Sequence, residues 1–132
     1  MNLASLPVTA VYAALCGLLV VTLAANVVRF RLKNKVSMGD GGHRELSRAI
    51  RAHGNAVEYI PLALLLMALL ESNGAGHAWL HGYGILLVAG RLAHGFGMLV
   101  PASSANPPRQ LGIVASWLVI IVASLQLLWL AI

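Results

Sequence analysis

Apolar residues occur in long runs that are separated by short polar segments. These runs predict helices at residues 6–33, 44–71, 77–100 and 109–131. Each is about 20 residues or longer, which is the length an α-helix needs to cross the hydrocarbon core of a bilayer. No run alternates apolar and polar positions with a period of two, which argues against a membrane β-barrel. The pattern predicts an all-α membrane protein, a bundle of four transmembrane helices forming a single domain over residues 1–132.

The composition agrees with this prediction. Hydrophobic residues make up 59% of the 132 positions and charged residues only 10%, against about 25% charged residues in soluble domains. The formal net charge is +5. The basic residues flank an apolar run, so the charge indicates membrane orientation and not nucleic-acid binding. The single cysteine, Cys16, cannot form an intrachain disulfide, and no residue pattern indicates a bound metal.

The distribution of basic residues predicts the orientation of the helices. Six of them flank the first polar loop: Arg29, Arg31, Lys33, Lys35, Arg44 and Arg48. The second loop has none, and the third, at 101–108, is followed by Arg109. Lys and Arg accumulate on the cytoplasmic side of membrane proteins. We therefore expect the first and third loops in the cytoplasm and both termini on the opposite side of the membrane.

The second predicted helix carries a polar row within an arc of roughly 140°. Its members are Arg44, Glu45, Arg48, Arg51, Asn55 and Glu58. Glu45 and Arg48 are spaced to form an ion pair on a solvated helix start. Glu58 lies roughly 20 Å along the helix from Arg44, well inside the hydrocarbon. Because buried charges are costly in a membrane, Arg51, Asn55 and Glu58 are candidate functional residues.

The third predicted helix adds Arg91 and His94, one turn apart. Glu58 is the carboxylate at a suitable depth to pair with Arg91, whereas His94 fits either a core position or a functional role. The predicted topology places these groups in the same leaflet as Arg29, Arg31 and Arg109. They could form a cationic pocket containing one acidic group, which suits a small zwitterion with excess negative charge.

The segment Arg51-Ala52-His53-Gly54-Asn55-Ala56-Val57-Glu58-Tyr59-Ile60-Pro61 resembles the main signature of the MAPEG family, the membrane-associated proteins in eicosanoid and glutathione metabolism. Three shorter stretches are also similar: Val28-Arg29-Phe30-Arg31, Gly90-Arg91-Leu92-Ala93-His94 and Pro107-Pro108-Arg109. The chain looks like a bacterial-type relative of the microsomal glutathione S-transferases. The resemblance extends over nearly the whole chain.

The resemblance implies a homotrimer of four-helix subunits that binds glutathione, as co-substrate, between neighbouring subunits near the cytoplasmic side. Together with the predicted pocket, it gives these expected contacts to glutathione: Arg29 or Arg31, Arg51, His53, Asn55, Glu58, Tyr59 and Arg91. His53 would line the site of the next subunit. Arg109 matches the arginine that stabilises the thiolate, and His94 would assist it.

The implied activity is conjugation of glutathione to lipophilic electrophiles, with reduction of lipid hydroperoxides as a related reaction. Met98 stands where eicosanoid-producing members have a tyrosine, and Gly54 replaces a basic residue, so a generic detoxifying transferase fits better than an eicosanoid synthase. Another low-molecular-weight thiol would fit the same residues. The alternative is a non-catalytic lipid-binding or scaffold protein of the same fold. A proton-coupled drug exporter is disfavoured because the first helix has no carboxylate.

Overall fold

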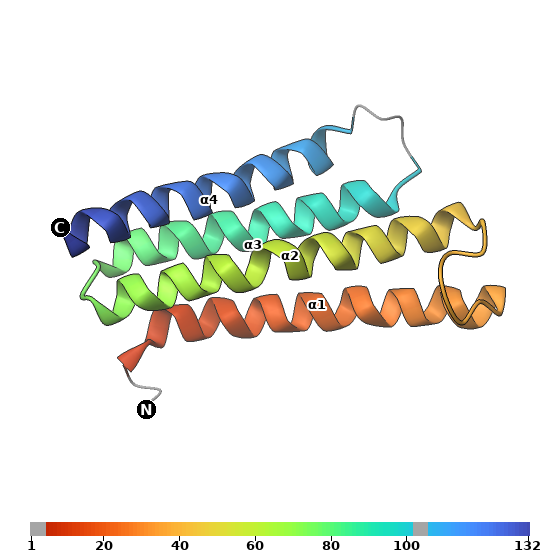
Figure 1. Cartoon of the computed structure of the whole chain (residues 1–132), viewed down its shortest axis with the longest axis horizontal. Coiled ribbons are helices and arrows are strands. Elements are labelled where there is room, and N and C mark those ends of the chain that lie inside the picture. Colours follow the sequence, from red (N-terminus) through yellow and green to blue (C-terminus); the bar gives the residue numbers. More distant parts are fainter. Residues whose placement is uncertain (1–4, 102–105) are drawn as a thin grey trace.

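The computed structural model describes residues 5–101 and 106–132. Within these residues the helices are α1 (Pro7–Asn34), α2 (Arg44–Ser72), α3 (His77–Leu99) and α4 (Pro107–Ala131). They run alternately up and down in one bundle, so the start of α1 and the end of α4 lie at the same end (Figure 1). The prediction of an all-α four-helix fold is confirmed. Residues 102–105 of the predicted third loop lie outside the described residues.

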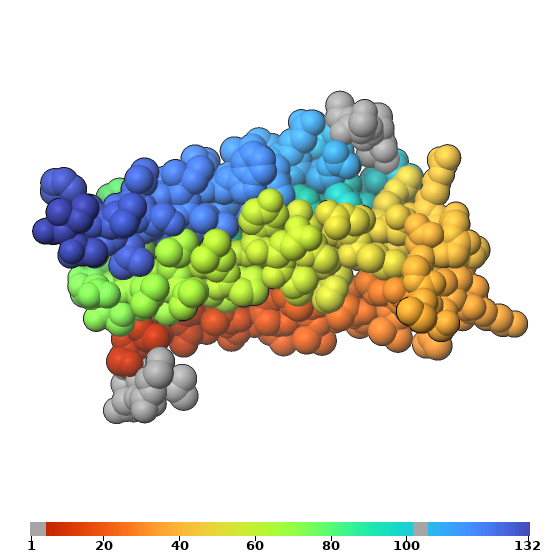
Figure 2. Space-filling view, viewed as in Figure 1, coloured from red at the N-terminus to blue at the C-terminus, as the bar shows by residue number. Residues whose placement is uncertain are grey.

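Three of the helices, α1, α2 and α4, are long and apolar enough to cross a membrane. The remaining helix, α3, is the shortest, with 23 residues. It packs against all three other helices, and α4 and α2 largely cover it on the face shown in Figure 2. Its central position explains its composition, because Arg91 and His94 are buried against protein and do not face lipid.

The outer surface of the bundle is apolar. Large hydrophobic side chains are exposed along α1 and α4, among them Leu18, Val21, Leu111, Leu125 and Trp129. Exposing such a surface to water is unfavourable. Lipid tails form no hydrogen bonds, so contact with them carries no such cost. The chain is therefore an integral membrane protein by length, composition and surface.

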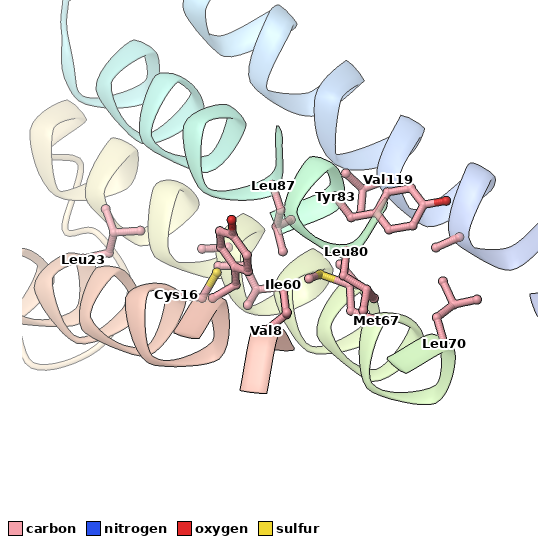
Figure 3. Close-up of a cluster of buried hydrophobic side chains, with 14 of the residues drawn as sticks. Val8, Cys16, Leu23, Ile60, Met67, Leu70, Leu80, Tyr83, Leu87 and Val119 are labelled. Carbon is pink, nitrogen blue, oxygen red and sulfur yellow. The ribbon is translucent and has the colours of Figure 1, made fainter. Parts of the chain in front are cut away.

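The interior is filled by small and medium-sized apolar side chains from all four helices (Figure 3). Cys16 of α1, Ile60 of α2, Leu87 of α3 and Val119 of α4 belong to this cluster. Cys16 is almost fully buried, so its thiol serves to fill space in the core. The cluster fixes the relative positions of the helices from which the polar groups described below project.

Glycines bring α3 and α4 unusually close together. A Cβ atom at Gly90 would lie 2.7 Å from Cβ of Ala115, and one at Gly112 would overlap the Gly90 carbonyl oxygen. A Cβ at Gly97 would lie 2.6 Å from the backbone nitrogen of Arg109. Small residues permit such close approach of membrane helices. The contact places the first turns of α4 directly beside His94 on α3.

Candidate functional site

Three helices contribute polar residues to one region of the bundle. The first half of α2 carries Arg51 and Asn55, and the second half of α3 carries Arg91 and His94. The first turn of α4 carries Arg109. The up-and-down topology brings these segments to the same end of the bundle (Figure 1). The structure therefore brings Arg51, Asn55, Arg91, His94 and Arg109 into one half of the molecule.

Arg91 is the best-buried charged group of this region, with 1% of its surface exposed. Its Nη2 donates to Oδ1 of Asn55 at 2.7 Å, and its Nη1 donates to Oγ of Ser116 at 3.1 Å. The Ser116 hydroxyl in turn donates to the Gly112 carbonyl at 2.9 Å. The centre of the guanidinium lies 5.9 Å from the centroid of the Tyr59 ring. Each contact is with a neutral group, so the positive charge of Arg91 is oriented but not neutralised.

This arrangement differs from the expected Arg91–Glu58 pair. The Glu58 carboxylate lies instead 3.9 Å from Nη1 of Arg51, two turns away on the same helix. Both side chains are more than half exposed, 61% for Arg51 and 53% for Glu58. A loose ion pair of this kind contributes little by itself. Glu58 therefore remains accessible to a ligand or to another copy of the chain.

A cavity of about 360 Å³ lies beside the Arg91 network. It is lined by Arg51, Asn55, His94, Met98, Arg109, Gln110, Ile113 and Trp117. This lining includes two cations and no carboxylate. Met98 of α3 and Ile113 and Trp117 of α4 form an apolar part of the wall. The volume falls within the range of about 300–1,000 Å³ that is usual for small-molecule sites. Such a cavity can bind an anion next to an apolar group.

His94 lines this cavity with only 3% of its surface exposed. Its Nδ1 makes no hydrogen bond with any described residue, and neither does Nε of Arg91 one turn earlier. Buried polar atoms are normally hydrogen-bonded, and exceptions are concentrated at functional positions. Both orphaned atoms belong to residues that the sequence had already identified as candidates.

The start of α4 is held by a residue that the sequence analysis missed. The Asn106 side chain donates from Nδ2 to the Gly97 carbonyl at 2.7 Å and accepts from the backbone N–H of Arg109 at 3.3 Å. It therefore caps α4 and joins this helix to the last turns of α3. Asparagine followed by prolines is a typical helix N-terminus, so Asn106 could have been recognised. The cap makes α4 begin two residues before the predicted boundary at 109.

Other predicted site residues lie away from the cavity. Arg29 donates to Oδ1 of Asn26 at 2.9 Å, and Arg31 donates to the Gly39 carbonyl at 2.8 Å. His53 is half-buried and does not line the cavity. Conversely, Gln110, Ile113 and Trp117 line it without having been predicted. Gln110 directly follows Arg109, and Ile113 and Trp117 lie one and two turns beyond it. Only the position of α4 against α2 and α3 brings these residues to the site.

The fold and the site together define a class: a membrane-embedded four-helix bundle with a cationic cavity between α2, α3 and α4. The profile of the MAPEG family matches residues 9–129 of the chain. The chain is also 44% identical over 122 residues to the inner membrane protein YecN of Escherichia coli strain K12, covering 92% of this chain and 91% of the relative. YecN of Escherichia coli O6:H1 strain CFT073 is equally similar. The chain belongs to the MAPEG family.

Proposed function

We propose that this protein is a membrane-embedded glutathione transferase that conjugates the thiol of glutathione to lipophilic electrophiles. The observation that supports the proposal most directly is the cavity beside Arg91, which joins a cationic wall to an apolar one. Glutathione carries two carboxylates, one ammonium group and one thiol. Its net negative charge matches a site where the Arg91 guanidinium is hydrogen-bonded to the neutral side chains of Asn55 and Ser116, and where Arg51 lies 3.9 Å from the Glu58 carboxylate.

The residues divide into two roles. Arg51, Asn55, Glu58 and Tyr59 would hold the peptide, together with the buried charge of Arg91. Arginine binds carboxylates through two parallel hydrogen bonds, so it can hold the ends of the peptide in a fixed register. Glu58 is the acidic group beside these residues, and it would bind the ammonium. Its loose contact with Arg51, at 3.9 Å, leaves the carboxylate available for this purpose.

Arg109 and His94 would act on the sulfur. A free thiol has a pKa of about 8.5, and a nearby cation lowers this pKa, which raises the fraction of reactive thiolate. The thiol proton leaves to solvent, the thiolate forms a carbon–sulfur bond with the electrophile, and the leaving group departs with its electron pair. Met98, Ile113 and Trp117 give the electrophile an apolar surface beside the sulfur. Arg109 would stabilise the sulfur before transfer, with His94 as its neighbour.

We infer that a second copy of the chain completes the site. Arg51 and Glu58 are more than half exposed on one chain, although Glu58 lies roughly 20 Å along α2 from its first residue. Exposure of such charges to lipid is costly, and burial against another subunit removes that cost. The homotrimer that the family resemblance implies would provide this cover. Of the two arginines on α1, Arg29 is the better candidate for the shared site, because its side chain bonds Asn26 one turn away on its own helix, whereas the Arg31 side chain is directed to the Gly39 carbonyl in the following loop.

The distribution of basic residues supports an orientation in which the site faces the cytoplasm and both chain ends face away from it. The end of α1 and the start of α2 hold most of the Lys and Arg residues, which favour the cytoplasmic side. A cysteine introduced near either end of the chain would then react with an impermeant thiol reagent only from the non-cytoplasmic side, in a background with Cys16 replaced by Ala.

The test combines glutathione binding with turnover. Purified protein should bind glutathione in isothermal titration and conjugate it to chlorodinitrobenzene with release of chloride. Arg51→Ala should weaken binding, whereas Arg109→Ala should lower turnover and shift the pH profile of the reaction to higher pH. Arg48→Ala is the matched control, because it removes the same charge one turn before Arg51 and outside the cavity lining. Absence of binding at millimolar glutathione would refute the proposal.

The same experiment tests the alternative of a non-catalytic lipid-binding or scaffold protein. The presence of Met98 in the cavity lining favours this alternative, because a thioether cannot donate a hydrogen bond to the sulfur as a hydroxyl can. A scaffold protein would show no turnover with any electrophile, either as the parent protein or as Arg109→Ala. It would still bind its ligand in both forms.

A further inference from the structure

A second cavity lies at the end of α1, away from the proposed glutathione site. It has a volume of about 430 Å³ and is lined by Val28, Arg31, Leu32, Lys35, Val36 and Ser37. None of these residues lines the cavity beside Arg91. Val28, Arg31 and Leu32 are spaced by three and four residues along α1, so they lie on one face of the helix, and Lys35 directly follows the last residue of α1. We call this cavity the α1 groove.

The α1 groove is divided into an apolar part and a cationic part. Val28 and Leu32 are strongly exposed, at 54% and 75%, although they belong to a helix that is apolar enough to cross a membrane. Arg31 and Lys35 follow toward the end of the helix. From Val28 to the end of α1 at Asn34 the helix rises by about 9 Å. This distance is comparable to the step from the upper acyl chains of a bilayer to its phosphate layer.

The cations of the groove differ from their neighbours in how they are paired. Lys33, which lies between Arg31 and Lys35 in the sequence but outside the groove lining, forms an ion pair with Glu45 at 3.0 Å. By contrast, the only hydrogen-bond partner found for the Arg31 side chain among the described residues is the neutral Gly39 carbonyl. The Lys35 ammonium has no ion pair with a described residue. The carboxylate of Asp40 in the following loop accepts from the backbone N–H of Gly42. The groove thus carries positive charge with no anion bound to it among the described residues.

The end of α1 presents fewer free carbonyl groups than a helix C-terminus usually does. Helix C-termini normally present free carbonyl groups and a partial negative charge. In α1 the chain turns at Lys35, which has a left-handed backbone with φ of 54°. The turn directs the N–H groups of Lys35 and Val36 back to the Arg31 carbonyl, and the Lys35 N–H also contacts the Leu32 carbonyl. These carbonyls are therefore occupied within the backbone.

We propose that the α1 groove binds the headgroup phosphate of an anionic phospholipid. Arg31 and Lys35 contact the phosphate, the Ser37 hydroxyl is placed to donate to it, and an acyl chain lies along Val28 and Leu32. A free phosphate or a soluble phosphate ester has the same charged group. The lipid is the better occupant because the lower half of the groove is apolar and faces the bilayer. This proposal does not depend on the proposed transferase activity.

Native mass spectrometry of the purified protein in micelles can test this assignment. Phosphatidylglycerol and phosphatidylcholine of the same chain length are supplied at equal concentrations, and the bound lipid is counted. The parent protein should retain phosphatidylglycerol in preference to phosphatidylcholine. Lys35→Gln should reduce the bound phosphatidylglycerol about fivefold, which is the effect of one basic residue at an anionic membrane surface. Leu32→Asn should also reduce lipid binding, since it removes the contact to the acyl chain.

Lys33→Gln is the matched control, because it removes the same charge two residues away from Lys35 and outside the groove lining. Its effect should be less than twofold. An equal loss for Lys33→Gln and Lys35→Gln would overturn the proposal, because it would indicate a diffuse attraction. Equal retention of the two lipids would also overturn it. A third arm adds glycerol 1-phosphate. Displacement of the lipid at equal concentration would assign the groove to soluble phosphate esters and reject the lipid.

Discussion

The two ends of the bundle each contain a buried charge, and the two charges are compensated differently. At one end, the Glu71 carboxylate accepts hydrogen bonds from the backbone N–H groups of Val8 and Thr9, at 2.9 and 2.8 Å. These N–H groups belong to the first turn of α1, where a helix has unpaired donors and a partial positive charge. At the other end, the Arg91 guanidinium is held by the side chains of Asn55 and Ser116.

We propose that the difference separates a structural charge from a functional one. Both Glu71 oxygens have backbone partners. Neither Glu71 nor Val8 or Thr9 lines the cavities described above, whereas Asn55, the partner of Arg91, lines one of them. Its role is to fix the start of α1 to the end of α2. Arg91 is oriented by neutral groups, its Nε has no partner among the described residues, and a cavity lies next to it. Under the proposed function, its charge would attract the anionic ligand in that cavity.

The largest effect should come from Arg91→Met, which removes the uncompensated charge and retains much of the side-chain volume. We expect glutathione affinity to fall at least 100-fold, about 3 kcal/mol, because the buried contact to the ligand is lost. The stability of the protein should fall by no more than about 1–3 kcal/mol, because Asn55 loses its partner whereas Ser116 keeps its bond to the Gly112 carbonyl, and removal of the buried charge offsets part of this loss. Isothermal titration and thermal unfolding measure the two effects. Unchanged affinity with lower stability would make Arg91 a structural residue.

Glu71→Ala should give the opposite result. Two hydrogen bonds to a charged group are lost, and the N–H groups of Val8 and Thr9 are left without their partner. We expect a loss of about 2–3 kcal/mol in the free energy of unfolding, measured by titration with sodium dodecyl sulfate. The glutathione affinity of the folded protein should stay within twofold of the parent value. A large loss of affinity at full stability would show that the two ends of the bundle are coupled.

A smaller effect is expected at the cap of α4. Asn106→Ala should cost about 1 kcal/mol of stability, as is typical for an N-cap, and lower turnover about tenfold because Arg109 is no longer held beside α3. Turnover is followed with chlorodinitrobenzene at saturating glutathione. Asn106→Asp is the control, because aspartate still accepts from the Arg109 N–H but cannot donate to the Gly97 carbonyl. If Asn106→Ala destabilises the protein without lowering turnover, Asn106 does not position Arg109.

The helices could be predicted from the sequence because each depends on a local property, a long apolar run bounded by glycine, proline or charged residues. The observed helices end within two residues of the predicted spans. The largest difference is at the start of α4, which begins two residues earlier than predicted because Asn106 caps the helix. The central position of α3 was not predictable from hydropathy, since it depends on which helices pack together.

The partners of the site residues were harder to predict than their positions. Arg91 and Glu58 were matched by charge and depth, but charge and depth do not specify the direction of a side chain. Asn55 lies one turn before Glu58 on α2, and it reaches the guanidinium at 2.7 Å. Ser116 carries no sequence signal of its own, because a serine in an apolar helix can bind its own backbone, as this one also does.

Glu58→Gln should have the smallest effect of the series. The contact with Arg51 is loose and exposed, so its loss should change stability by less than about 1 kcal/mol. Glutathione affinity should fall about fivefold, since the ligand ammonium loses its charged partner but keeps an amide oxygen to bind. N-acetylglutathione, which has no ammonium, provides the control. It should bind the parent protein and Glu58→Gln equally well. An equal loss of affinity for both ligands would show that Glu58 acts on the site by another route, for instance through Arg51, and does not bind the ammonium.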